Sequence, residues 1–280
     1  MPRMIIKTAA KTIAAAVMIA AIAFAVFFAA DNNTLRIAAT TSVHNAGLLE
    51  SLIPAFEKEC ECRVHVVVAG TGKALKLGEQ GDVDMLLVHA PESEEQYVKD
   101  GHGIGRQTIM HNAFVLAGPP NDPAAVKQAG GIAEAMKIIA TKRAPFISRG
   151  DDSGTHKKEM QLWRQSQAAD INGKWRIRAG AGMGRALLMA DQLRAYILSD
   201  SATFAALRDK TDLRIITTDN PPLKNEYSII IINPARHPQT NTALARRFGK
   251  WLLSPRAQGI IAAHQKFGER LFSPVRENRQ

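Results

Sequence analysis

The sequence predicts an α/β fold, because strand-like and helix-like segments alternate from about residue 31 to the C-terminus. With 280 residues, 46% of them hydrophobic and 22% charged, the chain can bury a full core and has the length of two lobes or domains. No internal repeat or low-complexity tract interrupts the alternation. Three strand-to-helix junctions carry the polar residues that decide the functional interpretation.

The first 30 residues have the outline of a secretory signal. A basic start is followed by an apolar run from residue 12 to residue 30, rich in Ala, Ile, Val and Phe. Phe27 or Phe28 occupies a position that signal cleavage normally reserves for a small residue, so an uncleaved membrane anchor is the alternative. In either case the sequence predicts export, and we expect residues 31–280 to function in the periplasm.

The predicted strands are short apolar runs at 35–39, 64–69, 84–89, 112–118, 145–148, 213–217 and 227–232. Those at 84–89, 112–118 and 145–148 have the unbroken apolar character of buried parallel strands. Helical spacing follows at 48–56, 160–163 and 187–193. The segments at 241–253 and 258–267 are expected to form amphipathic helices that pack on the first lobe.

The first polar junction follows the strand at 35–39. Thr40, Thr41 and Ser42 stand between this strand and a helical pattern that begins near Leu48. One hydroxyl would suffice to cap a helix, which is the structural alternative. Three in a row favour an additional role as hydrogen-bond donors.

A second junction follows the strand at 64–69. The run from Gly70 to Leu75 contains Thr71 between two glycines and turns the chain into another helix start. Taken alone, this motif is more often a plain turn. Together with the other junctions it predicts a second set of donors.

The third junction, residues 148–159, is the most informative stretch of the chain. Ser153 and Thr155 precede a helical run, and Gly154 lies between them, so that unpaired first-turn amides face whatever lies before the helix. Arg149 adds a planar guanidinium that suits a tetrahedral anion. A capped helix after a glycine turn is the structural alternative. Three such junctions in one chain favour an oxyanion site.

The net charge and the cysteines narrow the class of protein further. The formal net charge is +10, but basic residues are dispersed and only 6% of residues are aromatic, which disfavours nucleic-acid binding. The only cysteines, Cys60 and Cys62, flank a single residue, so they could form a strained disulfide in an oxidising compartment or stay free. They lack a partner pair at metal-finger spacing.

The ordered motifs of the chain resemble one known family, the tungstate-binding component of bacterial tungstate ABC importers, which is a type II periplasmic binding protein. The matching segments are Ala39–Ser42 with Gly47–Leu49, Gly70–Leu75, Gly81–Asp84 with Leu87–Ala90, Ser148–Thr155, Gly180–Gly184, Tyr196–Leu198, Asn225–Tyr227 and Ile232–Pro234. The chain departs from the family at Ala39 and Ala46, where Thr and Ser are usual, and at 200–203, where the family has Asp-Arg-Gly-Thr.

The resemblance implies two α/β lobes joined by two crossing strands, with the anion bound in the cleft between them. Residues 31–113 and 228–280 would form lobe one, and residues 114–227 lobe two. It also implies tungstate as the ligand, with molybdate left open, no cofactor and no resident metal. The partner would be an ABC permease in the inner membrane, and a monomer is expected. The predicted ligand-binding residues are Thr40, Thr41, Ser42, Thr71, Arg149, Ser153, Gly154 and Thr155.

Two alternatives stay open. A phosphate- or sulfate-binding protein of the same fold would differ in its acceptors, since monohydrogen phosphate carries a proton and tungstate does not. Asp151 and Asp152 are the available acceptors, and we expect both to point away from the ligand, one capping amides and one in solvent. A secreted hydrolase using Ser153 with His156 is disfavoured by their spacing, and no catalytic residue is predicted.

Overall fold

The structure is a computed structural model that describes residues 33–217, 223–266 and 268–275. The predicted signal at residues 1–30 lies outside these described residues. Within them, no helix is long and apolar enough to cross a membrane.

A mixed ten-stranded sheet forms the framework, with the order β2-β1-β3-β9-β4-β7-β5-β6, and with β12 and β8 paired to β4. The strands are β1 (Thr34–Thr40), β2 (Arg63–Ala69), β3 (Met85–Val88), β4 (Gly103–Gly118), β5 (Phe146–Ser148), β6 (Arg176–Arg178), β7 (Tyr196–Asp200), β8 (Arg214–Thr217), β9 (Lys224–Ile232) and β12 (Ser273–Pro274). A separate short hairpin joins β10 (Gln265–Lys266) to β11 (Glu269–Arg270).

The helices connect the strands in the predicted alternation. They are α2 (Thr41–Asn45), α3 (Leu49–Cys60), α4 (Thr71–Gln80), α5 (Pro91–Lys99), α6 (Ile132–Thr141), α7 (Gly154–Ser166), α8 (Met183–Gln192), α9 (Ser201–Leu207), α10 (Thr242–Leu252) and α11 (Pro255–Ala263), with single 3-10 turns at Val126–Gln128 and Arg208–Lys210.

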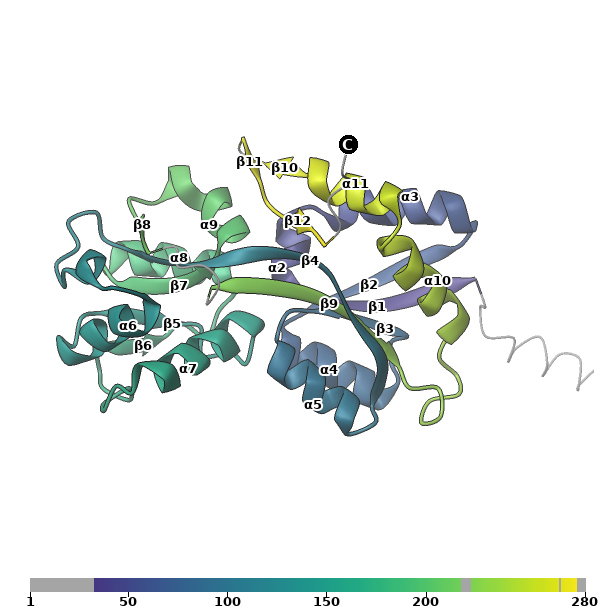
Figure 1. Ribbon diagram of the computed structural model, residues 1–280, viewed down its shortest axis with the longest axis horizontal. Helices are drawn as coiled ribbons and strands as arrows, with labels where there is room; N and C mark the ends of the chain where they lie inside the picture. Colours follow the sequence, from purple (N-terminus) through teal and green to yellow (C-terminus); the bar gives the residue numbers. More distant parts are fainter. Residues whose placement is uncertain (1–32, 218–222, 267, 276–280) are drawn as a thin grey trace, which may run out of the picture.

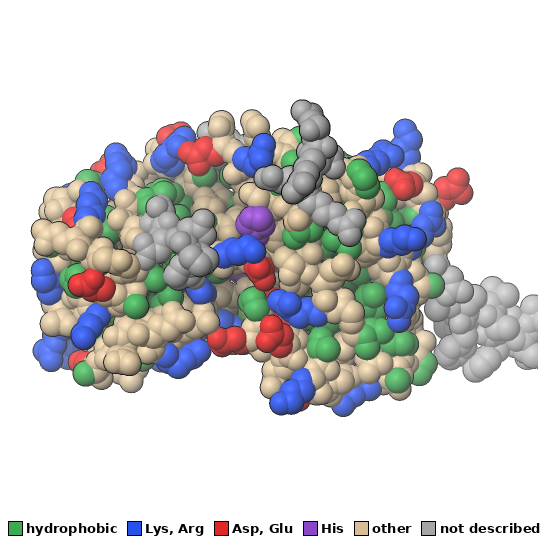
Figure 2. Space-filling view, viewed as in Figure 1, with side chains coloured by type: hydrophobic (Ala, Val, Ile, Leu, Met, Phe, Trp, Pro, Cys, Tyr) green, Lys and Arg blue, Asp and Glu red, His purple; other side chains and the backbone are tan. Residues whose placement is uncertain are grey.

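The elements gather in two halves that β4 and β9 connect (Figure 1). The first half contains β1 to β3, α2 to α5, α10 and α11, and the second contains α6 to α8 and β5 to β8. The crossing strands pair antiparallel from Gly103 opposite Ile232 to Ala113 opposite Lys224. A notch separates the halves at the lower edge of the surface (Figure 2). The lobe boundaries predicted at 113/114 and 227/228 fall inside these two strands, and they stay a prediction.

Each half has its own apolar core. The core of the first half includes Leu52, Phe56 and Phe248, and the rings of Phe56 and Phe248 lie 4.6 Å apart. In the second half, Phe146 and Trp163 pack edge to face at 5.1 Å. A further cluster lies in each half, around Leu86 and Ile230 in the first and around Ile147 and Ile197 in the second, so each half is a firm support for the loops that it carries.

Two predictions about secondary structure were wrong. The strand at 112–118 is antiparallel to each of its partners, β7, β8 and β9, because it is the end of the crossing strand β4 and not a member of a parallel unit. The segment 258–267 does not stay helical, since α11 ends at Ala263 and β10 follows. Apolar residues of this segment pack on the first half, and an apolar run of this kind is compatible with a helix or with a strand.

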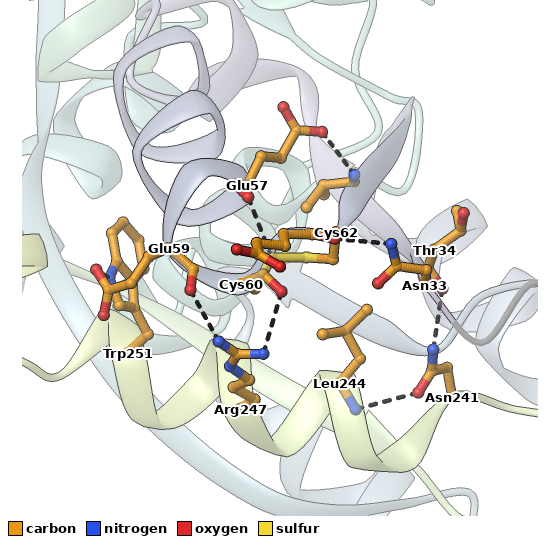
Figure 3. Close-up of a disulfide and its surroundings, with 12 residues drawn as sticks. Asn33, Thr34, Glu57, Glu59, Cys60, Cys62, Asn241, Leu244, Arg247 and Trp251 are labelled. Carbon is orange, nitrogen blue, oxygen red and sulfur yellow. Dashed lines mark hydrogen bonds between the residues drawn. A yellow bond between two sulfur atoms is a disulfide. The ribbon is translucent and has the colours of Figure 1, made fainter.

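The two cysteines form a disulfide at the end of α3 (Figure 3). Arg247 on α10 donates from its two terminal nitrogens to the carbonyl oxygens of Cys60 and Glu59, at 3.2 and 2.9 Å. These carbonyls belong to the last turn of α3, where no intrahelical donor is available. The disulfide and Arg247 together fix the turn from α3 into β2, which resolves the alternative that the sequence left open.

Candidate functional site

The starts of α4 and α7 meet at the boundary between the two halves. The Gly72 amide donates to the Asp152 carbonyl oxygen at 3.3 Å. Gly70 lies so close to Ser153 that a Cβ atom on Gly70 would be 3.9 Å from the Ser153 Cα atom. The second and third polar junctions of the sequence, 82 residues apart if counted from Gly70 to Asp152, are therefore neighbours in space.

The three polar junctions begin the helices α2, α4 and α7, and the first two of these helices have no side-chain cap. Thr40 at α2 and Gly70 at α4 make no side-chain capping bond, whereas Ser153 at α7 accepts a hydrogen bond from the His156 amide at 3.3 Å. First-turn amides without a cap keep their hydrogen-bonding capacity and carry the positive end of the helix dipole. The three hydroxyls of the first junction are thus not explained by capping.

The predicted ligand-binding residues are almost all buried. Thr40, Ser42, Thr71, Arg149, Ser153, Gly154 and Thr155 are buried, and Thr41 is half-buried. Two of them hold donors that lack any hydrogen-bond partner in the described structure: the Thr71 hydroxyl from the first half and Arg149 Nε from the second. Thr71 is 0% exposed and Arg149 is 4% exposed. Buried donors without partners are costly, so both point to a ligand that would accept from them.

A buried acid holds the Arg149 loop. Glu159 on α7 accepts from the Ser148 hydroxyl at 2.9 Å and from the Arg149 amide at 3.3 Å. Its other oxygen is bound by Arg176 at 2.8 Å, and both side chains of this ion pair are at most 4% exposed. No sequence pattern indicated this role for Glu159 or for Arg176, which lies on β6.

Asp151 caps the Ser153 amide, as the sequence predicted for one of the two aspartates, and it also binds Arg149. Its carboxylate lies 2.5 Å from Arg149 Nη2 and also accepts from the Ser153 amide at 3.2 Å. Burial alone would raise the pKa of Asp151, but the hydrogen bonds from Ser153 and the charge of Arg149 outweigh it and lower the pKa. Asp152 behaves as predicted, since its side chain is 66% exposed and pairs with Lys157 at 2.7 Å.

A buried polar cluster supports the first junction. Ser42 Oγ lies 3.3 Å from His89 Nε2 and accepts from the Tyr227 hydroxyl at 3.2 Å. His89 Nδ1 lies 2.9 Å from Asn225 Oδ1, and Asn225 also donates to Asn112 Oδ1 at 2.7 Å. Burial lowers the pKa of His89 despite its bond to Asn225, so the imidazole is neutral. The sequence placed His89 and Asn225 only within family motifs.

The geometry does not support the hydrolase alternative. His156 Nδ1 accepts a hydrogen bond from the Asp152 amide at 3.1 Å, and Ser153 Oγ is bonded to the His156 backbone. The imidazole therefore caps its own helix start and does not serve Ser153 as a general base. Among the described residues, no three His, Cys, Asp or Glu side chains are grouped to hold a metal ion.

A cavity of about 150 Å³ lies beside the predicted ligand-binding residues. Its lining includes His89 and Phe114 from the first half and crossing strand, and Gly154 and Lys158 from α7. Thr71 and Arg149 do not line it. We place the candidate anion site at the unpartnered donors, because an open cavity by itself does not supply convergent hydrogen bonds.

Comparisons with known proteins identify the family of the chain. Residues 10–256 match the model of the PBP superfamily domain. A tungstate-binding protein of Peptoclostridium acidaminophilum is 40% identical over 245 residues, which cover 86% of this chain and 85% of the relative. The structure of the tungstate ABC transporter from Geobacter sulfurreducens matches with a TM-score of 0.73 and 45% identity, covering 81% of this chain and 97% of the other.

A second solved structure, the tungstate-binding protein of Desulfovibrio alaskensis G20, has a TM-score of 0.75 and 40% identity, and covers 87% of this chain and 99% of its own. Two α/β halves joined by crossing strands, with a polar boundary between them, define the class of two-lobed binding proteins. The chain belongs to the PBP superfamily and, within it, to the family of tungstate-binding proteins that these relatives represent.

Proposed function

We propose that this protein captures tungstate outside the cytoplasm and delivers it to an ABC permease. The observation that carries the proposal is the pair of buried, unpartnered donors, Thr71 Oγ1 and Arg149 Nε, which come from opposite halves of the molecule. A single small anion between the halves would accept from both. The names of the relatives support tungstate as that anion.

The residues of the candidate site suit a fully deprotonated dianion. Thr40, Thr71 and Thr155 offer neutral hydroxyls, and Arg149 offers one positive charge. Desolvating a dianion is costly, so every oxygen needs a donor. Tungstate and molybdate carry no proton at neutral pH and need donors only.

Phosphate is disfavoured because its proton would need an acceptor. Asp151 has a side chain that is 25% exposed, and its oxygens already accept from Arg149 and from the Ser153 amide. Asp152 is exposed and paired with Lys157. Both carboxylates already have donors, so the proton of monohydrogen phosphate would have to reach one of their remaining lone pairs.

Capture would close the two halves on the ligand. The contact between the Gly72 amide and the Asp152 carbonyl, and the hydrogen bond from Gln161 Nε2 to Glu92 Oε1 at 2.8 Å, join the halves in this structure. Hinge closure about β4 and β9 would bring donors from both sides to one anion. The role is binding, not catalysis, and we propose a monomer in the periplasm as the working form.

Calorimetric titration of residues 31–280 with tungstate, molybdate, sulfate and phosphate tests the proposal. We expect one tungstate per chain and no measurable phosphate binding at micromolar concentration. Sulfate is the matched control, since it is also fully deprotonated but smaller. Tighter binding of phosphate than of tungstate would contradict the assignment of the ligand and leave the fold untouched.

A further inference from the structure

The buried cluster around His89 forms a closed ring of hydrogen bonds whose direction can be assigned. Asn225 Nδ2 donates to Asn112 Oδ1 at 2.7 Å and to the Tyr227 hydroxyl at 3.2 Å. Its carbonyl oxygen therefore faces His89 Nδ1, at 2.9 Å, and this imidazole nitrogen must carry the proton. Because the ring of His89 is neutral, Nε2 is left as an acceptor.

The remaining protons follow from this assignment. His89 Nε2 can only accept, so the Ser42 hydroxyl donates to it across 3.3 Å. Tyr227 donates its own proton to Ser42 Oγ at 3.2 Å. The circuit from Asn225 through Tyr227, Ser42 and His89 back to Asn225 is complete, with one donor for each acceptor.

We propose that His89 is a positioning residue of the anion site. Its neutral imidazole accepts a hydrogen bond from the Ser42 hydroxyl and so fixes the first polar junction to the crossing strands. Ser42 is then a support and not a donor to the anion. With its own proton directed to His89, Ser42 can only accept from the Thr40 hydroxyl, 3.2 Å away, so Thr40 would have to turn from Ser42 to donate to the ligand. The proposal rests on the proposed function only for the identity of that ligand.

The second half of the molecule also contacts the imidazole of His89. A Cβ atom on Gly154, at the start of α7, would lie 2.6 Å from His89 Cε1, so only a glycine lets α7 approach the imidazole this closely. Asn112 and Asn225 are register partners on β4 and β9. One imidazole thus contacts the polar junction of the first half, the crossing strands and the helix start of the second half.

Protonation of His89 would disrupt this arrangement. A proton on Nε2 would face Ser42 Oγ, so the Ser42 hydroxyl would have to turn away and the ring would open. The charged groups around the imidazole are of both signs: Arg149, Asp200, Lys157 and Lys158 from the second half, Lys224 and Glu226 on β9, and Glu92 on α5. None of these charged groups can close the ring of hydrogen bonds once Ser42 has turned away.

This structure, in which Gly154 of α7 lies against the imidazole, therefore favours the neutral form of His89. If separation of the two halves exposes this imidazole to water, closure lowers its pKa and is opposed by protonation once the pH falls below the ordinary value, which is about 6.5 for His. We expect the affinity for tungstate to be constant from pH 8 to pH 7 and to fall about three- to tenfold by pH 5.5. Closure below pH 6.5 would release a proton.

The proton positions can be tested without any anion. Nitrogen-15 NMR of the imidazole in the anion-free protein at pH 8 should show a protonated Nδ1 and an unprotonated Nε2, with the signals assigned by their loss in His89→Gln. The opposite tautomer, or an imidazolium, would overturn the proposal. This result does not depend on tungstate binding, so it stands apart from a failure of the proposed function.

The positioning role is tested by two amide replacements. A Gln at 89 can place an acceptor near the former Nε2, whereas an Asn reaches only the former Nδ1 position. We expect His89→Gln to bind tungstate at least about threefold more tightly than His89→Asn, and with no pH dependence between 5.5 and 8. His44→Gln, at an exposed position on α2, is the control and should match the native protein.

Equal affinities for the Gln and Asn variants, or a native pH profile retained in His89→Gln, would contradict the role of Nε2 as the acceptor. Thermal unfolding of each variant shows whether the fold survives. If both variants unfold at a lower temperature than the native protein, the tautomer seen by NMR in the native chain still decides whether His89 Nε2 is an acceptor.

Discussion

The two halves of the molecule hold the loops of the proposed anion site with different chemistry. In the first half, the junction at Thr40 to Ser42 rests on a neutral ring through His89, Asn225 and Tyr227. In the second half, the Arg149 loop rests on a buried ion pair, since Glu159 binds both Arg176 and the Arg149 amide.

The difference follows from what each loop presents. The second half carries Arg149, whose charge we propose faces the ligand, and the buried pair of Glu159 and Arg176 adds no net charge beside it. The first half presents neutral hydroxyls and amides, for which a neutral ring is sufficient. Breaking one member of a buried ion pair leaves an uncompensated charge, whereas a lost neutral hydrogen bond costs less. The second half should therefore be the more sensitive to substitution.

The largest expected effect is on stability, from Glu159→Gln. The change would leave the Arg176 guanidinium buried without its counter-charge, and we expect unfolding to be easier by about 3 to 5 kcal/mol. Chemical denaturation would measure it. Glu226→Gln is the matched control, because that side chain is 32% exposed and pairs with exposed Lys224. A loss as small as that of the control would show that the ion pair is not a support.

Arg149→Ala should have the largest effect on affinity. Removing the guanidinium leaves the anion under-neutralised in a buried site, so tungstate binding should weaken at least tenfold, about 1.4 kcal/mol or more. Calorimetric titration measures the change. Arg246→Ala, at an exposed position on α10, should bind as the native protein does. Unchanged affinity in a folded Arg149→Ala protein would remove the second half from the site.

Closure can be tested by adding a single methyl group to the start of either helix. A Cβ atom on Gly154 would meet the buried His89 ring, whereas one on Gly72 would meet the exposed Asp152 carboxylate. A flexible surface side chain can move aside, but the imidazole is held on several sides. We expect Gly154→Ala to weaken tungstate binding about tenfold and Gly72→Ala less than threefold. Equal losses would mean that His89 does not limit closure.

The smallest effects are expected from the two carboxylates. Asp151→Asn and Asp152→Asn should each bind tungstate within about threefold of the native protein, less than 1 kcal/mol. For Asp151 two consequences oppose each other, since the variant loses an ion pair with Arg149 but no longer repels the anion. Isothermal titration with tungstate and phosphate checks both variants. Phosphate binding by the native protein that either change abolishes would identify that carboxylate as a ligand acceptor.

Local signals predicted the helix starts, because Gly70, Ser153 and their neighbours have turn and capping preferences that act within a few residues. The supports could not be predicted in this way. Ser42 and His89 are 47 residues apart, and His89 and Asn225 are 136 apart, so no spacing relates them. The direction of the 112–118 strand was missed for the same reason, since its apolar run carries no information about its partners.

The most direct test of a site shared by both halves is a crystal structure with tungstate, read at an X-ray wavelength where tungsten scatters anomalously. We predict one tungsten peak between the two halves, with oxygens of the anion within hydrogen-bond distance of Thr71 Oγ1 and Arg149 Nε. A single peak in the neighbouring cavity lined by Lys158 and Phe114, with Thr71 Oγ1 and Arg149 Nε still unpartnered, would contradict the account.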